Sequence, residues 1–218
     1  MILHDFTNEN SILNHFIAEL RDKDIQKDSE RFRKNIERIN QILSYELSKH
    51  LNYRTKKITT PLADTKIEII EDSVVICSVL RAGLAAHNGL LHYFDKAESA
   101  FISAYRTFDK ETESFDVEVE YLSSPDLKNK ILIIVDPMLA TGTSLKNVYD
   151  VLRTKGCAKE THLVCTIAAP EGIDFLDENL PKNTHLWIAQ IDDFLNEKGY
   201  IIPGLGDAGD LAYGKKMD

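Results

Sequence analysis

The amino-acid sequence predicts an α/β fold, in which a parallel sheet is covered by helices on both faces. Short apolar runs such as "ILIIV" (131–135) alternate along the chain with segments in which apolar residues recur every three or four positions. Strands without polar alternation are typical of a sheet that is buried on both faces. Because the 218 residues show no internal repeat and no Pro/Gly linker, we expect one domain over 1–218.

The expected elements follow in order from residue 29. Residues 29–50 predict a helix, the main part of an N-terminal helical region (1–50), and "TTPL" (59–62) predicts a turn. Further strands are expected at 72–80, 99–105, 131–135, 161–169 and 184–191, and further helices at 83–94 and 144–155. Ligands of such sheets bind at the carboxyl ends of the strands.

Two segments depart from this alternation. Residues 107–130 are polar, and "VEVEYL" within them alternates like an edge strand, so we expect an exposed hairpin or a mobile flap centred on 107–122. The segment "GYIIPGLGDAGDLAYG" (199–214) holds five of the ten glycines. A flexible tail is one interpretation of so many glycines, but the apolar "YIIP" argues for an anchored segment.

Composition limits the classes of function. Lys and Arg (26) minus Asp and Glu (35) gives −9, which disfavours a broad nucleic-acid-binding face but allows a small pocket for a phosphorylated metabolite. No apolar stretch approaches ~20 residues, so no membrane span is expected. The first turns lack the apolar run of a secretory leader, and the protein is expected to be cytoplasmic. We expect Cys77, Cys157 and Cys165 to be buried, reduced thiols.

The junction after "ILIIV" carries the main chemical signal. Asp136 follows the strand, and Pro137 favours an extended backbone there, so the carboxylate can accept hydrogen bonds from paired sugar hydroxyls. "ATGTS" then leads into a helix, where Thr141, Thr143 and Ser144 add hydroxyl donors beside a favourable helix dipole. The pattern predicts a sugar-phosphate site and lacks the Gly-Lys-Ser/Thr of a Walker A loop. The alternative is an ordinary turn with a capping Ser or Thr.

"VDPMLATGTS" (135–144) resembles the phosphoribosyl pyrophosphate signature of the uracil phosphoribosyltransferase family. "VLRAGL" (79–84), "AAPEGI" (168–173) and "GYIIPGLGDAGD" (199–210) resemble other blocks of that family, in the same order, from about residue 30 onward. The resemblance implies a type I phosphoribosyltransferase fold. It also implies transfer of the phosphoribosyl group from 5-phospho-α-D-ribose 1-diphosphate (PRPP) to uracil N1, which gives UMP and pyrophosphate.

The resemblance also implies roles for individual residues. The expected catalytic residues are Arg81, Arg106, Asp136 and Asp207. The expected PRPP-binding residues are Arg81, Arg106, Asp136, Pro137, Met138, Leu139, Ala140, Thr141, Gly142, Thr143, Ser144 and Asp207. The expected uracil-binding residues are Ile201, Gly206, Asp207 and Ala208. Each arginine also has a simpler interpretation: Arg81 as a surface arginine in a salt bridge, and Arg106 as a solvated residue at the start of an acidic loop.

Cofactors and partners follow from the same resemblance. Mg²⁺ is expected, bound mainly through PRPP and water, so no side chain is assigned as its ligand; Asp207 is the best placed to hold a magnesium-bound water. The substrates are uracil and PRPP, GTP is an activator in parts of the family, and a homodimer or larger homo-oligomer is implied. No nucleic-acid or membrane partner is expected.

Three positions depart from the family pattern. Thr143 replaces a frequent glycine, and its Cβ restricts the backbone of the phosphate loop. Leu211 stands where a basic residue is common. "AAHNG" (85–89) is also unusual, and His87 within it is expected on the helix surface or at an interface.

Three other functions compete with this interpretation. A phosphoribosyltransferase for another base would lack "GLGDAGD" (204–210). A regulator that binds pyrimidine nucleotides and RNA would need a basic face, which the charge of −9 disfavours. An inactive homologue paired with a uridine kinase is the third; the chain carries no kinase P-loop.

Overall fold

The computed structural model describes residues 1–109 and 114–217; the side chains of 104–120 lie outside its described part. The strands are β1 (Ile2–Asp5), β2 (Tyr53–Thr59), β3 (Asp64–Ile70), β4 (Val74–Leu80), β5 (Glu98–Asp109), β6 (Ser114–Ser123), β7 (Ile131–Val135), β8 (Met138–Leu139), β9 (Glu160–Ala168), β10 (His185–Ile191), β11 (Phe194–Leu195) and β12 (Ile201–Ile202). The helices are α1 (Leu13–Arg21), α2 (Ser29–Ser48), α3 (Gly83–Leu91), α4 (Thr143–Arg153), α5 (Pro170–Asn179) and α6 (Ala208–Tyr213).

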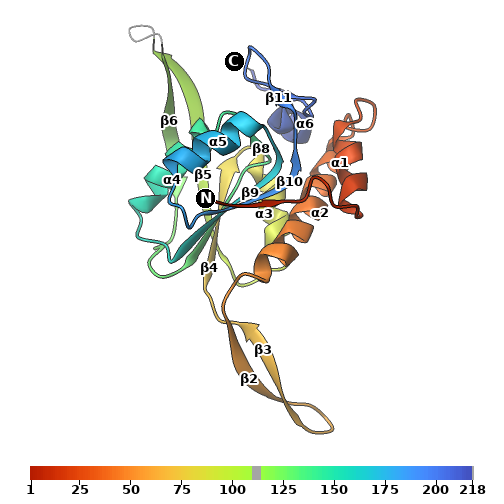
Figure 1. Cartoon of the computed structure of the whole chain (residues 1–218), viewed down its shortest axis with the longest axis vertical. Helices are drawn as coiled ribbons and strands as arrows, with labels where there is room; N and C mark the ends of the chain where they lie inside the picture. Colours follow the sequence, from red (N-terminus) through yellow and green to blue (C-terminus); the bar gives the residue numbers. More distant parts are fainter. Residues whose placement is uncertain (110–113, 218) are drawn as a thin grey trace.

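The main sheet runs in the order β1-β10-β9-β7-β4-β5-β6, with the short β8 beside β9 (Figure 1). Its neighbouring strands are parallel, except that β6 runs antiparallel to β5. Alternate residues of β4 enter two separate apolar clusters, one on each face. Helices α1, α2, α3 and α6 cover one face, and α4 and α5 cover the other. The predicted fold class is therefore confirmed.

Helix α2 shows how the local sequence sets an element. Asp28 caps its first turn by accepting hydrogen bonds from the backbone N–H groups of Glu30 and Arg31, at 3.0 and 3.1 Å. The apolar residues at helical spacing, Phe32, Ile36, Ile39 and Leu43, are all buried in one cluster. The apolar face of α2 is therefore buried within this chain.

Several elements were not predicted. They are β1, the hairpin β2–β3, the short strands β8, β11 and β12, and the helices α5 and α6, whereas α1 falls within the expected helical region 1–50. The predicted turn at 59–62 lies at the tip of the β2–β3 hairpin. Strand β6, within the 107–130 segment, pairs antiparallel with β5, which continues the predicted strand 99–105 as far as Asp109; the register shifts between Ser103 and Ala104. Residues 110–113 lie outside the described residues, and closure of the segment over a ligand stays a prediction.

Two expectations about burial were wrong. His87 is 2% exposed, because α3 packs it against the sheet, where its Nε2 lies 3.0 Å from Ser99 Oγ. Burial lowers the pKa of His87 to about 4. Cys157 is exposed, whereas Cys77 and Cys165 are buried, and all three are free thiols. Among the helices described, none is both long and apolar enough to cross a membrane.

Candidate active site

A cavity of about 910 Å³ opens at the carboxyl ends of the central strands. Its wall combines the residues that follow β4, the residues that follow β7, and the Gly-rich segment 199–209. Strand ends from distant parts of the sequence meet here because the strands are parallel. The cavity lies where the sequence analysis expects a ligand.

Asp136 occupies the floor side of this cavity, directly after β7. Its backbone N–H donates to Val164 O on β9 at 3.2 Å, and its carboxylate accepts a hydrogen bond from the backbone N–H of Met138, also at 3.2 Å. Burial raises the pKa of Asp136 to about 6, and the Met138 hydrogen bond offsets only part of that effect. The carboxylate is thus poorly solvated and suited to accept further hydrogen-bond donors.

The loop from Ala140 to Ser144 turns the chain from β8 into α4. Gly142 is the N-cap of α4, with a left-handed φ of 83°, and makes no side-chain cap. The positive φ therefore falls on a glycine, and Thr143 is simply the first residue of the helix. The expected backbone restriction at Thr143 does not apply, and the alternative of a Ser or Thr N-cap was wrong.

Helix α5 supports this loop from behind. A Cβ on Gly172 would lie 2.2 Å from Ala140 O, and a Cβ on Gly142 would lie 2.9 Å from Gly172 O. The first turn of α5 and the loop thus touch backbone to backbone, which requires glycine at both positions. This contact explains the "AAPEGI" block as a packing element of the site rather than a ligand contact.

Arg81 enters the cavity from the end of β4, after a cis peptide bond with Leu80. Its guanidinium bonds to Asp210 Oδ1 at 2.9 Å and to Gly214 O at 3.1 Å, while its buried Nε has no hydrogen-bond partner among the described residues. The side chain is 38% exposed. The salt bridge of the simpler interpretation is therefore present, at an arginine that lines the cavity.

The Gly-rich segment is held from the far end of the sequence. Arg21 forms an ion pair with Asp192 and donates to Gly204 O at 3.2 Å, and Asp192 accepts from Gly204 N–H at 2.9 Å. Gln26 donates to Leu205 O at 3.2 Å. The carbonyl and the N–H of Gly204 are thus both fixed, so the segment is anchored rather than a flexible tail.

Asp207 begins α6 as its N-cap. Its carboxylate accepts a hydrogen bond from the backbone N–H of Asp210 at 2.9 Å. Asp210 in turn pairs with Arg81, so a short chain of polar contacts joins Arg81, after β4, to Asp207, at the start of α6. Leu211, at the departure from the family pattern, packs against the apolar cluster on the α2 side.

Comparison with known proteins identifies the family. A model of the uracil phosphoribosyltransferase family matches residues 7–215. The chain belongs to this family. A uracil phosphoribosyltransferase of Porphyromonas gingivalis is 48% identical over 209 residues, covering 96% of each chain. One of Pyrococcus furiosus is 39% identical, covering 92% of this chain and 85% of the relative. The chain is accordingly an enzyme of the pentosyltransferase class.

Solved structures agree with this assignment. A protein of Aquifex aeolicus superposes with a TM-score of 0.86 at 29% identity, covering 98% of both chains. A hypoxanthine-guanine phosphoribosyltransferase of Bacillus anthracis superposes with a TM-score of 0.51 at 13% identity, covering 78% of this chain and 83% of that one. The second similarity shows the fold alone, which is the type I phosphoribosyltransferase fold.

Most residues that the family resemblance singled out lie on one cavity. The lining includes Arg81, Asp136, Met138, Leu139, Ala140, Thr141, Gly142, Ser144, Ile201, Gly206 and Asp207. Within the described part of the chain, Pro137, Thr143 and Ala208 lie outside that lining, and Ala208 is fully buried. Arg106 lies in β5 opposite Val117, with its side chain outside the described residues.

Sequence analysis missed several polar residues of the lining. Asn196, Tyr200 and Lys216 line the cavity with the family residues. Lys216 adds a positive charge to the lining, and the pair "KK" after the Gly-rich segment is the signal that would have pointed to it. Arg21, Gln26 and Asp192 lie behind the lining and hold the Gly-rich segment in place. No local sequence pattern predicts this role.

Proposed function

We propose that this cavity performs the reaction of the family, in which uracil N1 replaces the pyrophosphate on C1 of PRPP to give UMP and pyrophosphate. The observation that carries the proposal is Asp136: a poorly solvated carboxylate sits between a phosphate-type loop and an anchored Gly-rich segment. One ligand that bears a diol, a phosphate and a leaving pyrophosphate fits these three features together.

Asp136 binds the ribose. Its carboxylate has one protein hydrogen bond in the described structure, and burial makes its charged form costly. The two ribose hydroxyls are donors that would satisfy the remaining lone pairs and lower the pKa of Asp136 again. Binding energy thus fixes the orientation of C1 relative to the incoming base.

The loop 140–144 binds the 5′-phosphate. The first turn of α4 begins here without a side-chain cap, so its backbone N–H groups and the helix dipole favour an anion. Thr141 and Ser144 line the cavity beside them and supply hydroxyl donors. Pro137, Met138, Leu139, Gly142 and Thr143 shape the loop around this phosphate.

Arg81 binds the pyrophosphate. Its pairing with Asp210 is an ion pair in a partly exposed position, where such a pair contributes only about 0–1 kcal/mol. A leaving group with several negative charges would therefore compete well with the Asp210 carboxylate. The guanidinium then stabilises the charge that develops as the C1–oxygen bond breaks. Arg106 is proposed as the second arginine of this role, on the family resemblance alone.

The Gly-rich segment binds uracil. Ile201, Gly206 and Asp207 line the cavity, and Ala208 follows them at the start of α6. Backbone N–H and C=O groups of such a segment match the two carbonyls and the N3–H of uracil, and they would meet the amino group of cytosine with a donor. Selection of uracil is therefore proposed to depend on the rigid backbone set by Arg21 and Asp192.

Magnesium fits the donor set of the cavity. Asp136, Asp207, Thr141 and Ser144 offer oxygen atoms, which Mg²⁺ prefers, and the Asp136 carboxylate lacks a cationic partner among the described residues. When bound with PRPP, Mg²⁺ supplies positive charge to the pyrophosphate. Asp207 is proposed to orient its water. Direct protein ligands are not required, because Mg²⁺ commonly keeps several waters.

A homodimer or larger homo-oligomer is proposed as the working form. The hairpin β2–β3 extends away from the body of the chain (Figure 1), and Tyr53, Leu62 and Ile67 on it are 43%, 97% and 52% exposed. An isolated two-stranded hairpin is only marginally stable in water, so a second copy is a suitable support. Cytoplasmic location and activation by GTP are proposed from the resemblance, and the GTP response is measured as a change in rate at fixed PRPP.

The test is UMP formation from uracil and PRPP with Mg²⁺, with cytosine, hypoxanthine and adenine in parallel. Asp136→Asn is compared with Asp174→Asn, which changes an exposed carboxylate on α5. We expect turnover with uracil alone and a loss of about 100-fold or more in kcat/KM for PRPP in Asp136→Asn only. No turnover with any base, or equal losses in both variants, would overturn the proposal.

A further inference from the structure

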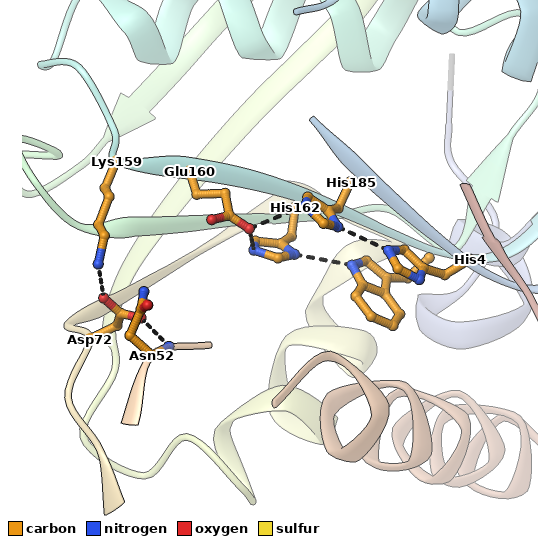
Figure 2. Close-up of polar contacts among 8 residues, drawn as sticks. His4, Asn52, Asp72, Lys159, Glu160, His162 and His185 are labelled. Carbon is orange, nitrogen blue, oxygen red and sulfur yellow. Dashed lines mark hydrogen bonds and ion pairs between the residues drawn. The ribbon is translucent and has the colours of Figure 1, made fainter. Parts of the chain in front are cut away.

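A cluster of histidines lies at the end of the sheet opposite the cavity. His185 is the first residue of β10, and His4 on the edge strand β1 comes next to it, with a distance of 2.9 Å between His4 Nε2 and His185 Nδ1 (Figure 2). His50 follows the end of α2, and its ring centroid lies 4.8 Å from that of His4. Three segments that are distant in sequence thus bring three imidazoles together.

We propose that His4, His50 and His185 form a binding site for one divalent transition-metal ion, with Zn²⁺ as the reference ion. One nitrogen from each ring lies within 4.8 Å of the other two. Bonds of about 2.0–2.1 Å to zinc place tetrahedral ligand atoms about 3.3 Å apart, so small rotations of these side chains bring the nitrogens into range. Imidazole nitrogens suit zinc, nickel and copper, and not magnesium.

Glu160 orients the central ligand. His185 Nε2 lies 3.3 Å from Glu160 Oε1, so the nearby carboxylate favours the tautomer that carries the ring proton on Nε2 (Figure 2). The lone pair is then on Nδ1, the nitrogen that faces His4. A carboxylate behind a ligating histidine is the usual second partner of such metal sites. Glu160 is therefore a positioning residue of the site.

A different trio, Glu160, His162 and His185, also meets the distance criterion, but its chemistry opposes a metal. The Trp187 indole N–H, which can only donate, bonds to His162 Nδ1 at 3.1 Å. The neutral ring must then carry its proton on Nε2, which lies 3.0 Å from Glu160 Oε1 (Figure 2). His162 consequently has no lone pair to offer, and its Nε2 makes no hydrogen bond of good geometry to the described residues.

The surroundings suit a cation that arrives from solvent. His50 is exposed, while His4 and His185 are half-buried, so the site has an open side where water can complete the coordination. Helix α2 ends two residues before His50, and its C-terminal dipole favours positive charge; the C-cap Lys49 is paired with Glu46.

A bound ion would join β1, β10 and the end of α2. Because the unfolded chain cannot hold the three ligands together, the ion stabilises the folded state in proportion to the excess of metal over its Kd. The site is far from the substrates, being at the opposite ends of the same strands. Its proposed role is to fasten the edge strand, and uracil turnover is not expected to depend on it.

The test uses the full chain with Cys157→Ser, which removes the exposed thiol as a competing zinc ligand. Zn²⁺ is titrated by calorimetry at pH 7.5 in the presence of Mg²⁺, and the imidazole nitrogens are followed by ¹⁵N NMR. His50→Gln is the test variant, because His50 is exposed and its replacement leaves the core intact. His92→Gln, another exposed histidine, is the matched control, and Glu160→Gln tests the positioning role.

We expect one Zn²⁺ per chain, with coordination shifts on His4 and His185 and a raised Tm. His50→Gln and Glu160→Gln should each weaken Zn²⁺ binding by about tenfold or more, and His92→Gln should leave it unchanged. Equal affinity in His50→Gln and His92→Gln would overturn the proposal. So would zinc shifts confined to other histidines, which would place the ion at those residues, or one bound Zn²⁺ without any histidine shift, which would place it on carboxylates such as those of the cavity.

Discussion

The two walls of the active-site cavity are built in opposite ways. The phosphate wall, from Asp136 to Ser144, is a continuous stretch in which a buried strand, a glycine N-cap and a helix start follow one another. The uracil wall, 201–208, is held by residues 179 and 183 positions away, because Arg21 donates to Gly204 O and Gln26 donates to Leu205 O. Arg21 also pairs with Asp192, which accepts from Gly204 N–H. The path of the first wall follows from one stretch of sequence, with α5 packed behind it at Gly172, whereas the second wall is held by residues near the other end of the sequence.

This difference predicts which of the two KM values rises when the residues behind each wall are changed. A change behind the uracil wall should raise KM for uracil more than KM for PRPP, because Gly204 loses its fixed position. A change behind the phosphate wall should do the reverse. The split between the two KM values separates a damaged wall from a general loss of folded protein, which lowers the apparent kcat instead.

Arg21→Gln should have the largest effect. It leaves the Asp192 carboxylate, whose side chain is 2% exposed, without its cation, and breaking a buried pair in this way costs about 3–5 kcal/mol. Urea denaturation should show that loss in the free energy of unfolding. Steady-state kinetics should show KM for uracil raised by about tenfold, with KM for PRPP changed far less.

Arg31→Gln is the matched control for this variant. Arg31 also pairs with a carboxylate, Glu19, but its side chain is 49% exposed, and such surface pairs contribute little to stability because solvent screens them. If Arg21→Gln proved no more destabilising than Arg31→Gln, or raised both KM values equally, then the uracil wall would not depend on the Arg21–Asp192 pair.

The same comparison explains what the sequence could predict. The strands and the phosphate wall follow from apolar runs and from a strand-to-helix junction, both of which are short-range patterns. Arg21 and Asp192 carry no such signal, because their roles arise only when α1 meets the segment after β10. His87 was misplaced for a related reason: a polar residue in a helix is usually exposed, and only the packing of α3 on the sheet buries it.

Asp136 should give a pH-dependent effect of intermediate size. Its pKa is raised to about 6 in the folded chain, above the ordinary value of 3.8, so the folded state binds the proton more tightly than the unfolded state. Its contribution to stability is therefore present below about pH 4 and is lost as the pH rises through about 6. The loss amounts to about 3 kcal/mol for a shift of about two pKa units.

The measurement compares wild type with Asp136→Asn by urea denaturation between pH 4 and 7.5. Other groups titrate in this window, so the informative quantity is the difference between the two proteins. As the pH rises, the free energy of unfolding of the variant should increase relative to that of the wild type. The inactive Asp136→Asn should therefore be relatively more stable at pH 7.5. A difference that stays constant with pH would show that Asp136 is ordinarily solvated, and it would remove the physical basis of its proposed affinity for ribose hydroxyls.

Gly172→Ala should have the smallest effect on stability and should test the phosphate wall. The new Cβ would lie 2.2 Å from Ala140 O, and such overpacking costs about 1–3 kcal/mol. Replacing glycine in a helix returns at most about 1 kcal/mol, so the net loss should be about 1–2 kcal/mol. Because the loop must move away from α5, KM for PRPP should rise several-fold, with a smaller change in KM for uracil.

Glu178→Ala, an exposed change on the same helix, controls for α5 itself. An unchanged KM for PRPP in Gly172→Ala would mean that the loop tolerates displacement, and the phosphate would then be held by side chains rather than by the backbone.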